Sequence, residues 1–314
     1  MSNFVVSATP HVRSKDSIQG IMRDVIIALT PATVMGIVYF GINALLIVAI
    51  SIASAVFFEF LYQKLTKQRV TIDDLSAVVT GLLLALNMPS EAPLWMPIVG
   101  SAFAIIIAKQ LFGGLGQNFI NPALAGRAFL LASYPTAMTT WTVDGVTTAT
   151  PLALLKTGTF EPSSADFISA LTGHIGGCIG ETCAIALVLG GIYLLVKRVI
   201  TWRIPVVYIA TVLVLTGLIG RNGIRVPHYE ILVGGLLLGA FFMATDYTTS
   251  PMTAKGQIIM AFGCGLLTTL IRIYGGYPEG VSYSILIMNL CVPLIDRFAK
   301  AKIFGAKPKE AKKV

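Results

Sequence analysis

The chain has 314 residues, of which 55% are hydrophobic and only 12% are charged, and its formal net charge is +8. This composition is far too apolar for a soluble globular domain, so the sequence predicts an integral membrane protein. The basic residues are dispersed over loops and a lysine-rich tail without interleaved aromatic residues, which argues against a nucleic-acid-binding protein.

A short polar arm, residues 1–20, precedes the first apolar block and is predicted to remain on the mature protein. That block is long and has no small-residue cleavage site after it, unlike a signal peptide. The first half of the membrane region, residues 21–134, is predicted to hold five spans near 21–40, 42–61, 75–86, 94–112 and 122–134. The third span is too short to cross a hydrocarbon core of ~30 Å unaided, so neighbouring helices must shelter its ends.

A polar segment, residues 135–177, separates the two apolar halves and is predicted to be an external loop. Asp144-Gly145 is a turn signal. Thr150 followed by Pro151 predicts a helix N-cap with proline at the first helical position. The first amides and the dipole of that helix would favour an anion, so a phosphate esterified to Thr150 would be stabilised there. The simpler alternative is that Thr150 only caps a surface helix.

The second half of the membrane region, residues 178–296, is predicted to hold five more spans, followed by a basic tail at residues 297–314. These spans lie near 178–196, 204–219, 229–243, 257–274 and 281–295. A faint internal repeat relates the halves, because the sequence GLLL at 81–84 recurs at 235–238. Each copy is followed by a polar, proline-bearing break and later by a pair of glycines. Five spans per half predict two inverted repeats, whose short third and eighth spans would line a central site.

The distribution of lysine and arginine predicts the orientation in the membrane. With ten spans both termini lie on one side, and the ends and loops of that side hold eighteen of the 23 basic residues, Lys109 among them. The remaining five are Arg127, Lys156, Arg221, Arg225 and Arg272. Both termini are therefore predicted to be cytoplasmic, and the threonine-bearing segment external.

Two ionisable residues, Glu59 and Arg127, lie deep within predicted spans, where charges are costly and usually functional. Both are expected to point into the helix bundle and to find partners there. Four acidic residues near span ends are interpreted as solvated or capping residues: Asp24, Glu230, Asp246 and Asp296. The four cysteines include no CxxC pair, so neither a metal site nor a disulfide framework is predicted.

The sequence Thr147-Thr148-Ala149-Thr150 resembles the Ser/Thr-Gly-Ala-Thr flavinylation signature of the Rnf and sodium-pumping quinone reductase complexes. Thr148 stands where that signature usually has glycine. Because the last threonine of the signature carries FMN through a phosphoester, the resemblance implies covalent FMN on Thr150. The other candidate cofactor-binding residues are Asp144, Gly145, Thr147, Thr148, Ala149 and Arg127.

Longer motifs extend the resemblance over nearly the whole chain. PHVRSKDS at 10–17 and MRDVIIAL at 22–29 look like the start of the D subunit of Rnf complexes (RnfD). Four further segments resemble the core that RnfD shares with its quinone reductase homologue (NqrB). They are FINPALAGR at 119–127, MATDYTTSP at 243–251, GGYPEG at 275–280 and MNLCVPLIDR at 288–297. The quinone reductase homologue has a much longer N-terminal extension, so RnfD is the expected type.

The resemblance implies an electron-transfer subunit, not catalytic alone, of a ferredoxin:NAD⁺ oxidoreductase that exports sodium ions or protons across a bacterial or archaeal cell membrane. Its expected partners are the G subunit of the complex with a covalent flavin, the membrane iron–sulfur subunits, the flavin transferase and the lipid bilayer; noncovalent riboflavin is also implied. The expected fold is an all-α membrane protein of about ten helices in two inverted five-helix repeats, as in urea-channel-like proteins. The alternatives are an NqrB-like protein of the sodium-translocating quinone reductase and a passive channel or transporter of that fold.

Overall fold

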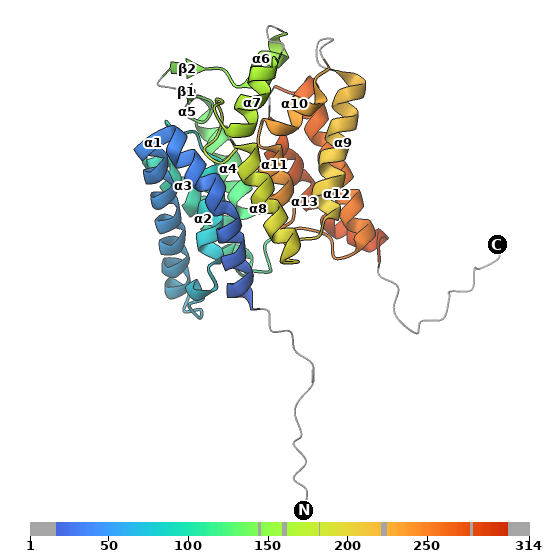
Figure 1. The fold of residues 1–314 in the computed structure, drawn as a ribbon. Coiled ribbons are helices and arrows are strands. Elements are labelled where there is room, and N and C mark those ends of the chain that lie inside the picture. Colours follow the sequence, from blue (N-terminus) through green and yellow to red (C-terminus); the bar gives the residue numbers. More distant parts are fainter. Residues whose placement is uncertain are drawn as a thin grey trace, which may run out of the picture.

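The computed structural model describes residues 17–143, 146–158, 162–181, 183–220, 225–276 and 279–300. Most of this part of the chain is helical, and two strands of three residues each are the exception to an all-α fold (Figure 1). Four helical stretches are long and apolar enough to cross a membrane, and three shorter apolar helices accompany them. The prediction of a mainly helical membrane protein is therefore confirmed.

The first half begins with α1 (Ile18–Leu65), which consists of two helices that meet at Gly41. The φ of Gly41 is +71°, a left-handed conformation that glycine adopts without steric cost, so the chain can reverse direction there. This confirms the predicted boundary between the first two spans. The remaining helices of this half are η1 (Ile72–Asp74), α2 (Ser76–Leu86), α3 (Trp95–Ala102), η2 (Phe103–Ile107), η3 (Gln110–Phe112) and α4 (Pro122–Ser133).

The second half is also built of helices. Its helices are α8 (Ala184–Val196), α9 (Arg203–Ile219), α10 (Pro227–Leu232), α11 (Leu236–Leu238), η4 (Gly239–Met243), α12 (Ala254–Tyr274) and α13 (Val281–Phe298). The span predicted at 178–196 begins as a helix only at Ala184. Before α8, the amide of Ile179 donates to the carbonyl of Met88, and the amide of Gly180 donates to the carbonyl of Leu86 at the end of α2. Because these amides bond to the first half, the two residues cannot form the first turn of a helix.

The segment between the halves, predicted as a loop, contains ordered elements. These are α5 (Pro135–Met138), the antiparallel strands β1 (Trp141–Val143) and β2 (Val146–Thr148), α6 (Pro151–Thr157) and α7 (Ser164–Thr172). Ser163 and Asp166 form a capping box at α7, and the hydrogen bonds from Ser163 hold the pKa of the exposed Asp166 carboxyl below its usual value. A small apolar core holds this layer on the bundle: Leu152, Leu155, Ala170, Ile175, Tyr229 and Val233.

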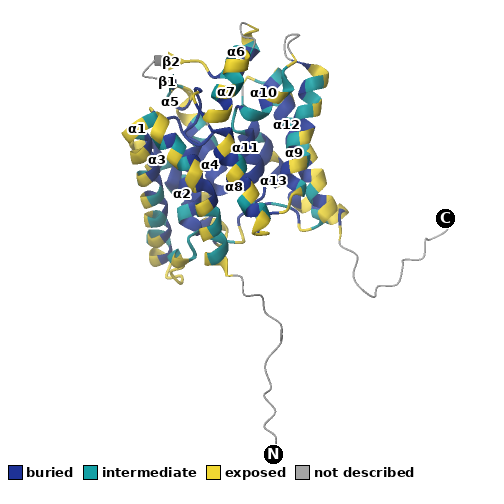
Figure 2. Ribbon diagram, viewed as in Figure 1, coloured by how far each residue is buried: buried dark blue, intermediate teal, exposed yellow. Residues whose placement is uncertain are grey.

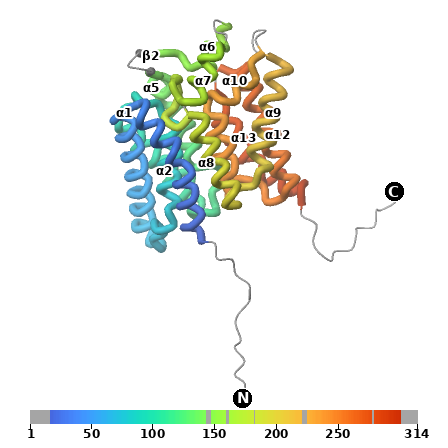
Figure 3. The backbone as a smooth tube through the Cα atoms, in the orientation of Figure 1, coloured from blue at the N-terminus to red at the C-terminus, as the bar shows by residue number. Residues whose placement is uncertain are grey.

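The two halves lie side by side, the first half in blue to green and the second in yellow to red (Figure 3). The start of α1 and the end of α13 lie at one end of the bundle, and α5 to α7 lie at the other (Figure 1). The interior is buried, whereas the outer faces of the helices are exposed (Figure 2). Large apolar side chains occupy those outer faces, for example Val38, Leu189 and Leu218. Such an apolar outer surface is suited to contact with lipid.

Candidate functional site

Thr150 is the N-cap of α6, as the sequence predicts. Its backbone is extended (φ −63°, ψ 150°), and its hydroxyl oxygen accepts a hydrogen bond from the amide of Ala153 at 3.2 Å. Pro151 has no amide hydrogen, and the Ala153 amide is engaged by the threonine itself. An anion beside Thr150 therefore needs a further donor of positive charge.

A cavity of about 220 Å³ opens beside this threonine, which is itself only 5% exposed. The hairpin, α4, α6 and the start of α13 enclose it. Its lining includes Arg127, Met138, Trp141, Thr148, Ala149, Thr150, Ala153, Glu279, Ser282 and Tyr283. The structure therefore brings four predicted cofactor-binding residues to one cavity: Arg127, Thr148, Ala149 and Thr150.

The other predicted residues of the loop have different positions. Thr147 is exposed on β2, opposite Thr142 of β1, and is not part of the cavity wall. Asp144 and Gly145 lie outside the described residues. The cavity is instead completed by Trp141, Ser282 and Tyr283, which were not predicted from the sequence because they come from elements that only the fold brings together.

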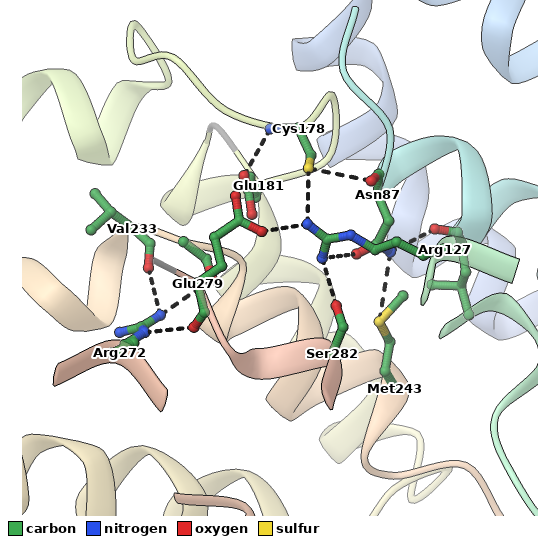
Figure 4. A network of polar contacts seen from close by, with 11 residues as sticks. Asn87, Arg127, Cys178, Glu181, Val233, Met243, Arg272, Glu279 and Ser282 are labelled. Atoms are coloured by element: carbon green, nitrogen blue, oxygen red, sulfur yellow. Dashed lines mark hydrogen bonds and ion pairs between the residues drawn. The ribbon is translucent and has the colours of Figure 1, made fainter. Parts of the chain in front are cut away.

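Arg127 projects from α4 into a network of polar contacts (Figure 4). Its Nη1 donates to Asn87 Oδ1 at 3.1 Å and to Ser282 Oγ at 2.6 Å. Its Nη2 contacts Cys178 Sγ at 3.5 Å and forms an ion pair with Glu279. The Nε atom is buried and has no hydrogen-bond partner among the described residues. The prediction that Arg127 points into the bundle and is paired there is confirmed, and one of its donors is left over.

Cys178, Glu181 and Glu279 lie close enough together to resemble a metal site, with their potential ligand atoms within 4.8 Å of one another. The guanidinium of Arg127 already contacts both the Cys178 sulfur and the Glu279 carboxylate. A fixed cation at this position disfavours a metal ion by charge repulsion. We therefore interpret the group as polar neighbours of Arg127, among which the Glu279 carboxylate forms the ion pair.

Glu59 is also buried and paired, as predicted, because Lys109 Nζ lies 2.8 and 3.0 Å from its two carboxylate oxygens. Gln110 and Ser76 complete this network. Lys109 lies in the turn between η2 and η3, but the residue is only 1% exposed, so it is buried and not a solvated loop residue. A buried carboxylate requires a compensating cation, and Lys109 at the end of the fourth span provides it.

A second cavity lies between the start of α1, α2, the start of α4 and the segment after η4. It is largely apolar, with polar groups from Asn118, Asn121, Asp246 and Thr248 in its wall. Asn121 is fixed as the N-cap of α4 and donates to the Met243 carbonyl at 3.3 Å. The third and eighth predicted spans, which the sequence analysis expected to line a central site, both contribute to the wall of this cavity.

Comparisons with known proteins agree with the resemblance noted in the sequence. The model of the NQR2, RnfD, RnfE family matches residues 5–305. The chain is 55% identical to the D subunit of the Na⁺-translocating ferredoxin:NAD⁺ oxidoreductase complex of Acetobacterium woodii, over 99% of this chain and 98% of the relative. It is 50% identical to the D subunit of the proton-translocating ferredoxin:NAD⁺ oxidoreductase complex of Clostridium ljungdahlii, over 97% of each chain. It is 36% identical to the D subunit of the ion-translocating oxidoreductase complex of Erwinia tasmaniensis, over 96% of this chain and 98% of that one.

Proposed function

Because the chain belongs to the NQR2, RnfD, RnfE family and is a membrane subunit of an ion-translocating oxidoreductase complex, we propose that it holds FMN covalently on Thr150. The observation that carries this proposal is that Thr150, the N-cap of α6, and Arg127 of α4 line one cavity. FMN would supply one- and two-electron redox chemistry in this cavity. Electrons would pass between this flavin, the flavin of the G subunit and the membrane iron–sulfur subunits.

The residues of the cavity fit an anionic, flat group. The guanidinium of Arg127 places a positive charge in the cavity wall, which favours a negatively charged ligand. Trp141 and Tyr283 offer aromatic surface. Thr150 supplies the oxygen for the phosphoester, and Thr148 and Ala149 shape the wall next to it.

The transported ion is sodium or the proton. The two relatives at 55% and 50% identity are named for different ions, so similarity alone favours neither.

We also propose ten spans in two inverted repeats, both termini in the cytoplasm and the Thr150 cavity on the external side. In Figure 1 the start of α1 and the end of α13 lie at the end of the bundle opposite to α6. This supports placing the termini and the Thr150 cavity on opposite sides of the membrane. Noncovalent riboflavin, the other implied cofactor, would fit the cavity of Asn118, Asn121 and Asp246, where polar groups border an apolar wall.

The test of the proposal is the variant Thr150→Ala, expressed with the flavin transferase and the other subunits. It should lose the fluorescent band of this protein on a denaturing gel and lose ferredoxin:NAD⁺ electron transfer, while the variant protein stays folded in the membrane. Losing an N-cap hydroxyl costs only about 0.5–2 kcal/mol, too little to unfold the bundle. Thr150→Ser should retain some flavin, because serine keeps both the cap and the oxygen.

Thr147→Ala is the matched control, because Thr147 lies in the same hairpin but outside the cavity wall. It should keep the fluorescent band. A band that persists in Thr150→Ala and disappears in Thr147→Ala would show that the flavin is attached to a residue other than Thr150. A wild-type protein without covalent flavin would instead favour a passive channel.

A further inference from the structure

The eighth span is interrupted at Gly234 and Gly235, whose φ values are +73° and +68°. Two consecutive left-handed residues turn the backbone sharply, and the three-residue helix α11 starts just after them. α10 ends just before, so the carbonyls of its last turn lack helical partners. Inside a membrane, such groups must be satisfied by other parts of the protein.

Arg272 of α12, which is 0% exposed, satisfies them. Its Nη1 donates to the Glu230 carbonyl at 2.7 Å, and its Nη2 donates to the carbonyls of Val233 and Gly234 at 3.1 and 3.2 Å. Its Nε donates to the carbonyl of Glu279 at 3.0 Å, in the segment before α13. We call these four backbone oxygens the carbonyl site; Figure 4 shows Arg272 beside Val233 and Glu279.

Four backbone oxygens converge on one cation at the carbonyl site. Carbonyl oxygens of interrupted helices and the negative ends of helix dipoles are the groups that coordinate small cations inside membrane proteins. Here the cation is a guanidinium on the protein's own α12, and its planar donors are shared among several acceptors. A neutral side chain could also fill the space, but it would leave the convergent carbonyl dipoles without a compensating charge.

We propose that the interruption of the eighth span is a backbone-built site for a monovalent cation, which Arg272 keeps permanently occupied, so that small cations cannot enter the second half of this protein. The proposal does not depend on the flavin at Thr150. It predicts that removing the guanidinium opens the site to mobile cations. It also predicts that free guanidinium ion, which has the same shape and charge as the lost group, closes it again.

The experiment uses the whole complex, purified and reconstituted in vesicles, with no electron donor present. Passive sodium entry is measured for Arg272→Ala and for the matched control Arg225→Ala, which removes an exposed arginine just before α10. Sodium should enter the Arg272→Ala vesicles several-fold faster than the wild-type vesicles. Guanidinium chloride should suppress this entry saturably, whereas the same concentration of urea should not. The Arg225→Ala vesicles should match the wild type.

An assembled Arg272→Ala complex that is as tight to sodium as the wild type would overturn the proposal. Should Arg272→Ala fail to assemble, Arg272→Gln decides the question, because glutamine fills much of the space and keeps hydrogen-bond donors but carries no charge. Arg272→Gln vesicles that leak sodium and respond to guanidinium support the proposal, and tight Arg272→Gln vesicles contradict it.

Discussion

Three buried basic side chains are neutralised in three different ways. Lys109 pairs with the carboxylate of Glu59, Arg272 donates to backbone carbonyls, and Arg127 divides its donors between Glu279 and neutral groups. Of these three residues, Arg127 is the one that lines the cavity beside Thr150.

The pair of Glu59 and Lys109 makes a prediction about stability. Lys109→Met should lower the thermal midpoint of the detergent-solubilised complex by several degrees, because it leaves a buried carboxylate without a cation, at a cost of about 3–5 kcal/mol. Adding Glu59→Gln should recover much of the loss, since both charges are then removed. The exposed Lys197→Met is the control and should leave the midpoint unchanged. A double variant less stable than Lys109→Met would contradict the pairing.

At the residue level, the sequence predicted features that follow from local rules. The cap at Thr150 depends on Pro151 and the adjacent helix formers, and the inward direction of Glu59 depends on its depth in a span. The ion-pair partners of the buried charges could not be predicted, because Glu279 is 152 positions from Arg127 and Lys109 is 50 positions from Glu59. No local spacing rule links residues so far apart, so the cavity could be predicted at its threonine but not along its walls.

At the level of elements, glycines set how closely the helices of the two halves approach. A Cβ on Gly190 of α8 would lie 2.1 Å from the carbonyl oxygen of Ala28 in α1. On Gly217 of α9 it would be no closer than 3.6 Å to its nearest neighbouring atom, an ordinary contact. The first position has no room for a methyl group, whereas the second does.

This difference predicts opposite outcomes for two similar substitutions. Gly190→Ala must push α1 and α8 apart, so it should lower the thermal midpoint and the yield of assembled complex. Gly217→Ala should leave both unchanged or raise the midpoint slightly, because alanine favours the helix. Size-exclusion chromatography and a thermal melt of each purified complex measure the effect. Equal behaviour of the two variants would show that α1 and α8 do not pack as described.

The elements that the sequence predicted best are those with strong local signals, namely the break at Gly41 and the cap at Thr150. The start of α8 was placed six residues too early, because residues 178–180 bond to the chain at and just after the end of α2 instead of starting the helix. The hairpin β1–β2 was missed for a similar reason. Three-residue strands are too short to give a detectable alternation of polar and apolar residues.

For the whole molecule, parallel contacts in the two halves support the proposed repeat. Ser51 in the second helix of α1 contacts Ser101 of α3 at 3.3 Å. Tyr208 of α9 likewise contacts Thr268 of α12 at 2.7 Å. In each half, therefore, the second and fourth spans are joined by buried hydroxyl groups.

The proposed orientation predicts the labelling of single cysteines in intact cells. In a Cys291→Ser background, a membrane-impermeant maleimide should react with Thr148→Cys, which lies in the exposed hairpin. Lys197→Cys, at the exposed end of α8, should react only after the cells are opened. Reaction of both residues in intact cells would contradict the predicted number of spans. The reverse pattern would mean that the protein has the opposite orientation in the membrane.

The pairing of residues 178–180 with the end of α2 bears on how the protein is made. Cys178 Sγ donates to the carbonyl of Asn87, which is 91 positions earlier in the chain, and the two amides after it satisfy the carbonyls of Met88 and Leu86. During synthesis the first half enters the bilayer before these donors exist, and its carbonyls would be costly to leave unpaired in hydrocarbon. The first half is thus an incomplete folding unit until the start of the second half has been synthesised.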